Sequence, residues 1–262
     1  AILSSQLPAA ALTRKGPLAG DIVLRGFSRD NILITVDDNK TFCACPNRMD
    51  PPAFHLSSQQ IETIQVRTGP FSVDQGGSVG GLIAVRTTDP PESSFSHLYG
   101  YLGSFDYVAA GLTGGLRPTE RLSVLAGLYF QKGGVYEDGS GLPFTRLPGT
   151  NYQTDVLAWD AFEVVTFEGK AIHTLPGEGT LTVTYAFQDA KEVLYPGLRM
   201  DAPKDEMNRA SITYRQLVSS SFADQVEASL AFSEVDHDMQ DHLRSSLYNM
   251  GGAFEQRGYF MR

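Results

Sequence analysis

Two short motifs place sulfur and imidazole side chains at spacings that could bind a metal ion. The first is Cys45-x-x-x-Met49, which lies in a loop bounded by prolines. The second is His237-x-Met239, which follows a run of alternating apolar and polar residues. Thiolate, thioether and imidazole donors favour Cu(I), whereas Mg²⁺ and Ca²⁺ prefer oxygen ligands. If the two motifs meet, three sulfurs and one imidazole form a soft, four-donor set for copper.

Each motif also has a structural interpretation that needs no metal. A lone Cys45 can be a small buried apolar residue, and Met49 can fill irregular space in a core. His237 and Met239 can simply lie in a solvated strand end. Cys43 stands outside the four-residue spacing; it could compete for metal or be oxidised, although a disulfide between cysteines two positions apart is strained. The predicted positions of the two motifs in the fold are therefore needed to distinguish a metal site from ordinary packing.

The composition of the 262-residue chain limits the function classes. Its 15 Phe and 11 Tyr exclude a disordered chain, and its net charge of −9 argues against nucleic-acid binding. Two cysteines exclude a disulfide-rich scaffold and a four-cysteine zinc site within this chain. No apolar run approaches the roughly 18 residues of a membrane helix, but the strands of a membrane β-barrel are half polar and leave no such peak.

The second half of the chain alternates apolar and polar residues with a period of two, which predicts strands with one apolar face. The clearest segments are residues 121–131, 180–188, 209–215 and 226–232. The short connections are residues 117–120, 176–179 and 219–221, and the long ones are residues 133–161, 189–208 and the region after 240. Short turns on one side and long loops on the other are typical of an outer-membrane barrel, although a soluble sandwich also alternates.

The alternation of apolar and polar residues in 226–232 predicts the direction of the His237 and Met239 side chains. The apolar residues of this strand are even-numbered and face outward, so the odd-numbered His237 and Met239 face the lumen if no bulge intervenes. The strand leaves a short turn and runs toward a long loop. Both side chains are therefore expected high in the lumen, on the extracellular side, where a loop of the N-terminal part could reach them.

Residues 61–88 form a glycine-rich hairpin that resembles a known family. They combine Ile61-Glu62-Thr63-Ile64-Gln65-Val66 with Gly69-Pro70, Gly76-Gly77 and Gly80-Gly81. With Leu24-Arg25-Gly26-Phe27 upstream, this segment resembles the plug domain of TonB-dependent outer-membrane receptors. One departure is Asp38, which follows Val36-Asp37 where the family usually has glycine.

This resemblance implies an all-β-dominated fold, in which a partial plug domain precedes the first antiparallel strands of a large transmembrane β-barrel of the 22-stranded type. We assign residues 1–90 to the C-terminal part of the plug and residues 91–262 to the incomplete barrel, with a linker near Asp89-Pro90-Pro91. About seven strands are expected in the barrel part. The family also implies a transport receptor and not an enzyme.

Longer stretches around the two motifs resemble the TonB-dependent copper receptors. They are Cys45-Pro46-Asn47-Arg48-Met49-Asp50-Pro51-Pro52, Leu194-Tyr195-Pro196-Gly197 and Val235-Asp236-His237-x-Met239. The resemblance implies a receptor that binds and imports copper as Cu(I), with Cys45, Met49, His237 and Met239 as metal ligands. It further implies a monomer in the outer membrane of a Gram-negative bacterium, surrounded by outer-membrane lipid and driven by the TonB energy-coupling complex of the inner membrane.

Two other functions stay open at this point. A TonB-dependent receptor for another ligand, such as a ferric siderophore, would make the sulfur residues incidental. A structural or adhesin barrel would share the strands without any transport. Metal content after purification distinguishes a receptor for another ligand from a copper importer. A TonB-binding segment distinguishes either kind of receptor from a structural or adhesin barrel.

Overall fold

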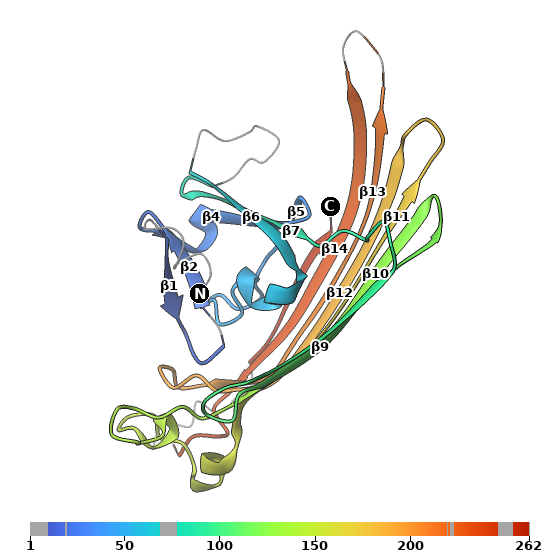
Figure 1. The fold of residues 1–262 in the computed structure, drawn as a ribbon. Helices are drawn as coiled ribbons and strands as arrows, with labels where there is room; N and C mark the ends of the chain where they lie inside the picture. The colour runs from blue at the N-terminus through green and yellow to red at the C-terminus, as the bar shows by residue number, and fades with distance from the viewer. Residues whose placement is uncertain are drawn as a thin grey trace.

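Strands dominate the structure, a computed structural model that describes residues 10–18, 20–68, 78–218, 220, 223–245 and 254–261. Figure 1 shows a small N-terminal unit beside a tall, curved sheet whose concave side faces that unit. The glycine-rich bend at Gly69-Pro70 and Gly76-Gly77, and most of the turn at 219–221, lie outside the described residues. Within the described part of the chain, no helix combines the length and apolar character needed to cross a membrane.

The N-terminal unit contains two small sheets around one apolar core. One sheet has the order β5–β4–β7–β6, in which β4 and β7 run parallel, and the other has the order β1–β2–β3. The strands are β1 (Ala10–Arg14), β2 (Gly20–Leu24), β3 (Phe27–Ser28), β4 (Ile32–Val36), β5 (Asn39–Lys40), β6 (Ile61–Arg67) and β7 (Gly81–Thr87). Among the described residues, three 3-10 helices connect these strands: η1 (Arg29–Asn31), η2 (Pro52–His55) and η3 (Ser58–Gln60). β-branched residues, which suit pleated strands, make up most of this core.

The remaining strands form one antiparallel sheet in which each strand pairs with its neighbours in sequence, as the all-β prediction requires. They are β8 (Phe95–Leu102), β9 (Val108–Thr119), β10 (Leu122–Gly134), β11 (Asp160–Thr174), β12 (Thr180–Val193), β13 (Asp201–Leu217), β14 (Gln225–Gln240) and β15 (Phe254–Met261). The sequence predicts about seven strands in this region, whereas the structure describes eight, because β15 also pairs with β14. The connection between β10 and β11 is long and contains η5 (Phe144–Arg146) and η6 (Thr154–Ala158). The predicted long loop at 189–208 is mostly strand, and only residues 194–200 connect β12 to β13.

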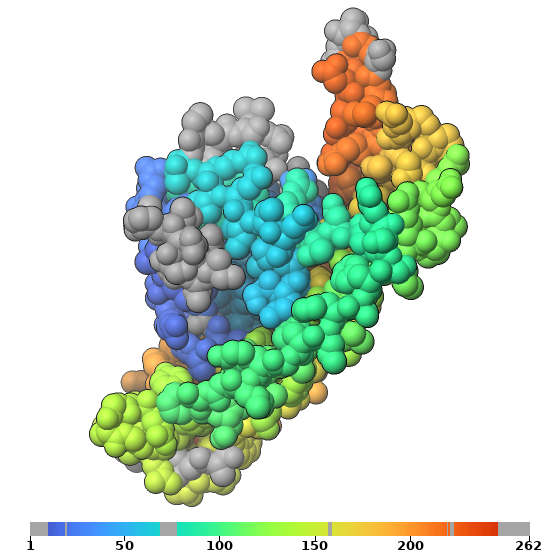
Figure 2. All heavy atoms as spheres, viewed as in Figure 1, coloured from blue at the N-terminus to red at the C-terminus, as the bar shows by residue number. Residues whose placement is uncertain are grey.

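The side chains of β14 follow the predicted alternation. Its odd-numbered residues Val235, His237 and Met239 are buried on the side of the N-terminal unit, whereas Leu230 and Phe232 are 57% and 39% exposed on the opposite face. Figure 2 shows the N-terminal unit seated against the concave side of the sheet. The polar face of the sheet and the N-terminal unit therefore bury each other.

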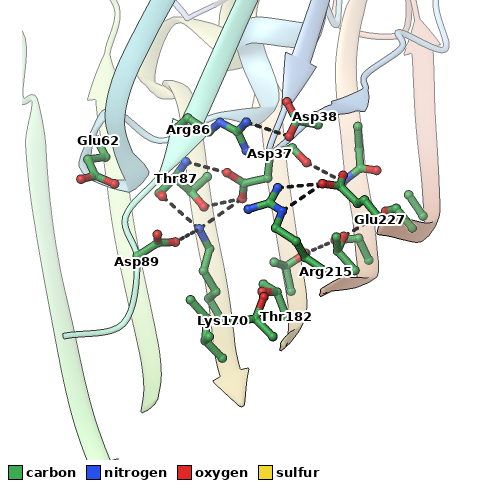
Figure 3. Close-up of a pocket in the computed structure, with 18 of the residues that line it drawn as sticks. Asp37, Asp38, Glu62, Arg86, Thr87, Asp89, Lys170, Thr182, Arg215 and Glu227 are labelled. Carbon is green, nitrogen blue, oxygen red and sulfur yellow. Dashed lines mark hydrogen bonds and ion pairs between the residues drawn. The ribbon is translucent and has the colours of Figure 1, made fainter. Parts of the chain in front are cut away.

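Lys170 of β11 joins the sheet to the N-terminal unit near the ends of the strands that have short turns (Figure 3). Its ammonium group donates to the Thr87 carbonyl and to the Asp89 carboxylate, both at 2.9 Å, and lies 3.4 Å from Asp37. Asp37 also accepts the backbone N–H and the hydroxyl of Thr87. These groups line one side of a polar cavity of about 920 Å³ between the two parts. A nearly buried ammonium thus fixes the position of the N-terminal unit on the sheet.

Replacement of Lys170 by Met should loosen the N-terminal unit from the sheet. The change removes charged hydrogen bonds worth about 1.5–3 kcal/mol and leaves the mostly buried Asp37 without its cation. Native-state hydrogen exchange should then become faster in β7. Arg86→Met is the matched control, because the Arg86–Asp38 pair is exposed and such pairs are worth at most about 1 kcal/mol. Equal protection in the Lys170→Met variant and the parent would contradict this role.

Candidate metal centre

The loop that carries Cys45 and Met49 is folded around the buried carboxylate of Asp50. Asp50 accepts the backbone N–H of Ala44 at 2.6 Å and that of Cys45 at 2.9 Å. The N–H of Arg48 donates to the Cys45 carbonyl at 2.8 Å. Hydrogen bonds to an ionised acceptor are the stronger ones, so a single side chain fixes this turn. Within it, Cys45 and Met49 are only 4% and 3% exposed.

Arg48 anchors the loop to the rest of the N-terminal unit. Its backbone is left-handed, with φ of 57°, and its guanidinium lies 3.2 Å from Asp21 and 3.0 Å from Asp30. Burial lowers the pKa of Arg48, but the hydrogen bond to Asp21 and the neighbouring negative charges together outweigh burial, so the pKa is raised. The Cys43 sulfur lies 3.6 Å from the same guanidinium, and burial raises the pKa of Cys43 to about 11. Cys43 is therefore a neutral thiol beside Arg48.

His237 and Met239 lie on β14, opposite a buried carboxylate on β13. His237 pairs with Asp205 in the strand register, and its Nδ1 lies 2.6 Å from Asp205 Oδ2. The other oxygen, Oδ1, lies 2.9 Å from Nε2 of His55 in η2. His237 and Asp205 have no exposed surface, and His55 has 3%. A carboxylate of the sheet thus links one histidine of the sheet to one of the N-terminal unit, and the sequence analysis identified neither Asp205 nor His55.

The structure places Cys45 beside His237, and it buries Cys45 in the same apolar cluster as Met49 and Met239. Sγ of Cys45, a carboxylate oxygen of Asp50 and a ring nitrogen of His237 all lie within 4.8 Å of one another. Cys45, Met49 and Met239 belong to a single apolar cluster. Nε2 of His237 is buried and has no hydrogen-bond partner among the described residues. The N-terminal unit thus contributes Cys45 and Met49 to this buried region, and the sheet contributes His237 and Met239.

The surroundings of Cys45 favour its thiolate. Burial raises the pKa of Cys45, but the neighbouring His237 ring and the backbone N–H groups of Met49 and Asn47 outweigh burial, so the pKa is lowered. The thiolate is the form that binds metal ions. A buried sulfur with a lowered pKa, next to a buried imidazole nitrogen, has the chemistry of a ligand pair.

A second group of possible ligands adjoins the first. Ligand atoms of Asp50, His55 and Asp205 also lie within 4.8 Å of one another. Their hydrogen-bonding capacity is largely used, because Asp50 accepts two backbone N–H groups and Asp205 contacts two histidines. The first group adds a sulfur and an imidazole nitrogen, which suit a soft metal ion, so it is the better candidate for copper.

Tyr195 covers the donor cluster from the connection between β12 and β13. Its fully buried hydroxyl donates to the Met49 carbonyl at 2.8 Å, and its backbone N–H donates to Asp201 at 2.7 Å. Nε of Arg244 donates to the same Asp201 at 2.7 Å, and its guanidinium carbon lies 3.6 Å from the centre of the Tyr152 ring. The long connections are therefore tied together next to the sulfurs and keep water away from them.

Replacement of Asp50 by Asn should loosen the loop and increase access to the Cys45 thiol. The amide offers one acceptor oxygen where the carboxylate offers two, so one backbone N–H loses its partner at a cost of about 1–3 kcal/mol. In a Cys43→Ser background, a thiol reagent should label Cys45 faster in the Asp50→Asn variant. Asp30→Asn is the control, since the Asp30 side chain is 96% exposed. Equal labelling rates with and without Asp50→Asn would rule out this role.

Comparisons with known proteins agree with this architecture. A family model for the TonB-dependent receptor plug domain matches residues 2–82, whereas a search of curated protein sequences gives no significant match. Among solved structures, the chain resembles the copper transporter OprC with a TM-score of 0.81 and 21% identity, over 97% of this chain and 38% of that one. It also resembles the FrpB iron transporter from Neisseria meningitidis, with a TM-score of 0.70 and 15% identity over 98% of this chain and 41% of that one. The siderophore receptor PirA from Acinetobacter baumannii gives a TM-score of 0.68 and 14% identity over 97% of this chain and 40% of that one.

The chain spans 38–41% of the length of these solved relatives. The structural likeness establishes the fold, and the plug-domain match establishes the nature of the N-terminal unit, which we call the plug from here on. Both are features of transport receptors and not of enzymes. The N-terminal unit is therefore a TonB-dependent receptor plug domain, and the strands that follow it share the fold of the corresponding part of these solved structures.

Proposed function

We propose that the chain is part of an outer-membrane receptor that binds and imports copper as Cu(I), with Cys45, Met49, His237 and Met239 as the ligands. One observation supports this most strongly: the Cys45 sulfur and a His237 ring nitrogen lie within 4.8 Å of each other, and Cys45 belongs to the same buried cluster as both methionines. Three sulfurs and one imidazole suit a soft monovalent ion. The resemblance to a solved copper transporter points the same way.

The division of the ligands between two parts of the chain suggests how copper would be released. Cys45 and Met49 belong to the plug, whereas His237 and Met239 belong to a barrel strand. The four donors can surround one ion when the plug is seated. A pull on the plug by the TonB complex would separate the two pairs and leave each with too few donors to hold the ion.

The outer face of the sheet suits a lipid environment. Its exposed side chains include Leu112, Leu128, Val183, Ile212, Val226, Leu230 and Phe232. Contiguous apolar surface of this kind is typical of the lipid-facing side of outer-membrane barrels. We accordingly place the receptor in the outer membrane of a Gram-negative bacterium as a monomer, with the plug ending near residue 90 and barrel strands from residue 91.

Loss of Cys45 should abolish copper binding. In the intact receptor, Cys45→Ala removes the thiolate that neutralises Cu(I), whereas Cys43→Ala removes a thiol that lies beside Arg48 and outside the donor cluster. We expect about one copper per receptor in the parent and in Cys43→Ala, and none in Cys45→Ala. Elemental analysis after anaerobic loading with Cu(I) and removal of free metal measures this.

The copper content of the parent and of the Cys45→Ala variant also distinguishes copper import from the other two functions. Stoichiometric copper in the Cys45→Ala variant, or none in the parent, would contradict the proposed site. A parent that binds a ferric siderophore and no copper would assign the receptor to that other ligand class. A barrel that binds neither would support a structural role.

A lysine on the outer face of β14 should destabilise the receptor in a bilayer. Leu230 is 57% exposed on that face, whereas Ser229 lines the cavity between sheet and plug. Leu230→Lys should lower the free energy of unfolding by about 2–4 kcal/mol if residue 230 lies near the middle of the bilayer. Ser229→Lys is the matched control, and its smaller effect is measured by the same urea titration in lipid vesicles. A larger loss for Ser229→Lys would reverse the assignment of the two faces.

A further inference from the structure

We propose that Asp205 is a positioning residue for copper binding, which orients His237 toward Cys45 and depends on His55 of the plug to do so. The inference rests on the proposed copper function. It gives a role to two buried side chains, Asp205 and His55, that are not among the four ligands. It also makes the geometry of a barrel ligand depend on whether the plug is seated.

The first contact fixes the imidazole of His237. Its Nδ1 lies 2.6 Å from Asp205 Oδ2, so Nε2 is the nitrogen left to bind a metal. Nε2 is buried, without a hydrogen-bond partner among the described residues, in the cluster that contains Cys45. Histidines that bind metals generally donate their other ring N–H to a carboxylate, which sets the ring orientation and raises ligand basicity. Asp205 is placed to do this for His237.

The second contact comes from the plug. Asp205 Oδ1 lies 2.9 Å from Nε2 of His55, and both side chains are buried. A buried carboxylate oxygen without a partner is unfavourable, so His55 holds Asp205 in the orientation that serves His237. His55 ends η2, shortly after the loop of Cys45 and Met49. Displacement of the plug would therefore remove two ligands and also release the carboxylate that orients the third.

The test is a double-mutant cycle in the intact receptor, with Cu(I) affinity measured by competition with a chromogenic Cu(I) chelator. We expect Asp205→Asn to weaken binding by about 10–100-fold, as for other residues that orient a ligand, and His55→Ala to weaken it less. The double variant should bind no more weakly than Asp205→Asn alone, because both changes act through one carboxylate. His55→Gln, whose amide can still donate to Asp205, should recover most of the affinity. Asp236→Asn is the control, because Asp236 is next to His237 in sequence, on the opposite face of β14, and contacts Lys204.

A spectroscopic readout separates positioning from general destabilisation. At the copper K-edge, the parent should show sulfur ligands and the outer-shell scattering of an ordered imidazole. Asp205→Asn should keep the sulfur scattering and lose much of the imidazole scattering, while the barrel keeps its heat-modifiable mobility in gels. Unchanged imidazole scattering in that variant would overturn the proposal.

The remaining outcomes are also decisive. A parent that binds no copper defeats the proposed function and this inference with it. A parent that binds copper, with Asp205→Asn unchanged or with strictly additive effects in the cycle, defeats the inference alone. Loss of an oxygen ligand in Asp205→Asn would make Asp205 a direct ligand and not a positioning residue. If Asp205→Asn does not fold, equal affinities in His55→Ala and His55→Gln would overturn the proposal.

Discussion

The structure depends on buried carboxylates of the plug and the sheet that find their partners across the contact between them. Asp205 of the sheet contacts His55 of the plug, and Lys170 of the sheet contacts Asp37 of the plug. Removing one partner of a buried pair leaves an uncompensated charge, which is strongly destabilising. The plug is therefore most stable in the position where both pairs form. That same position brings the Cys45 loop against β14, so the geometry of the proposed metal site follows from the contact between the plug and the sheet.

A site shared between two parts of a chain suits transport better than storage. When the plug is seated, the donors are buried, covered by Tyr195 and protected from water. A high affinity in this state is compatible with release, because movement of the plug changes the number of donors and requires no chemical reaction. The buried network around Asp205 extends this coupling to the orientation of a ligand on the barrel side.

Local sequence was sufficient for part of this account. A period of two predicts strands and their two faces, so the inward direction of His237 and Met239 could be inferred from β14 alone. Tyr129 is an aromatic residue among the polar positions of the alternating segment 121–131, and the structure shows why: the ring faces inward, and its hydroxyl donates to Glu168 at 2.6 Å. Asp205 could not be found this way, because its pairing with His237 depends on the register between two strands. An acidic residue at an inward position of the neighbouring strand is the signal that a search could have used.

The position of bound copper is the decisive measurement for the proposed site. Crystals of the intact receptor, loaded anaerobically with one equivalent of Cu(I), can be measured with X-rays on both sides of the copper absorption edge. The account predicts one anomalous peak between the Cys45 sulfur and the His237 ring, with Met49 and Met239 completing the coordination and bond lengths of roughly 2.0–2.3 Å, as for comparable nitrogen and sulfur donors. A peak at another place, or coordination by oxygen atoms alone, would contradict it.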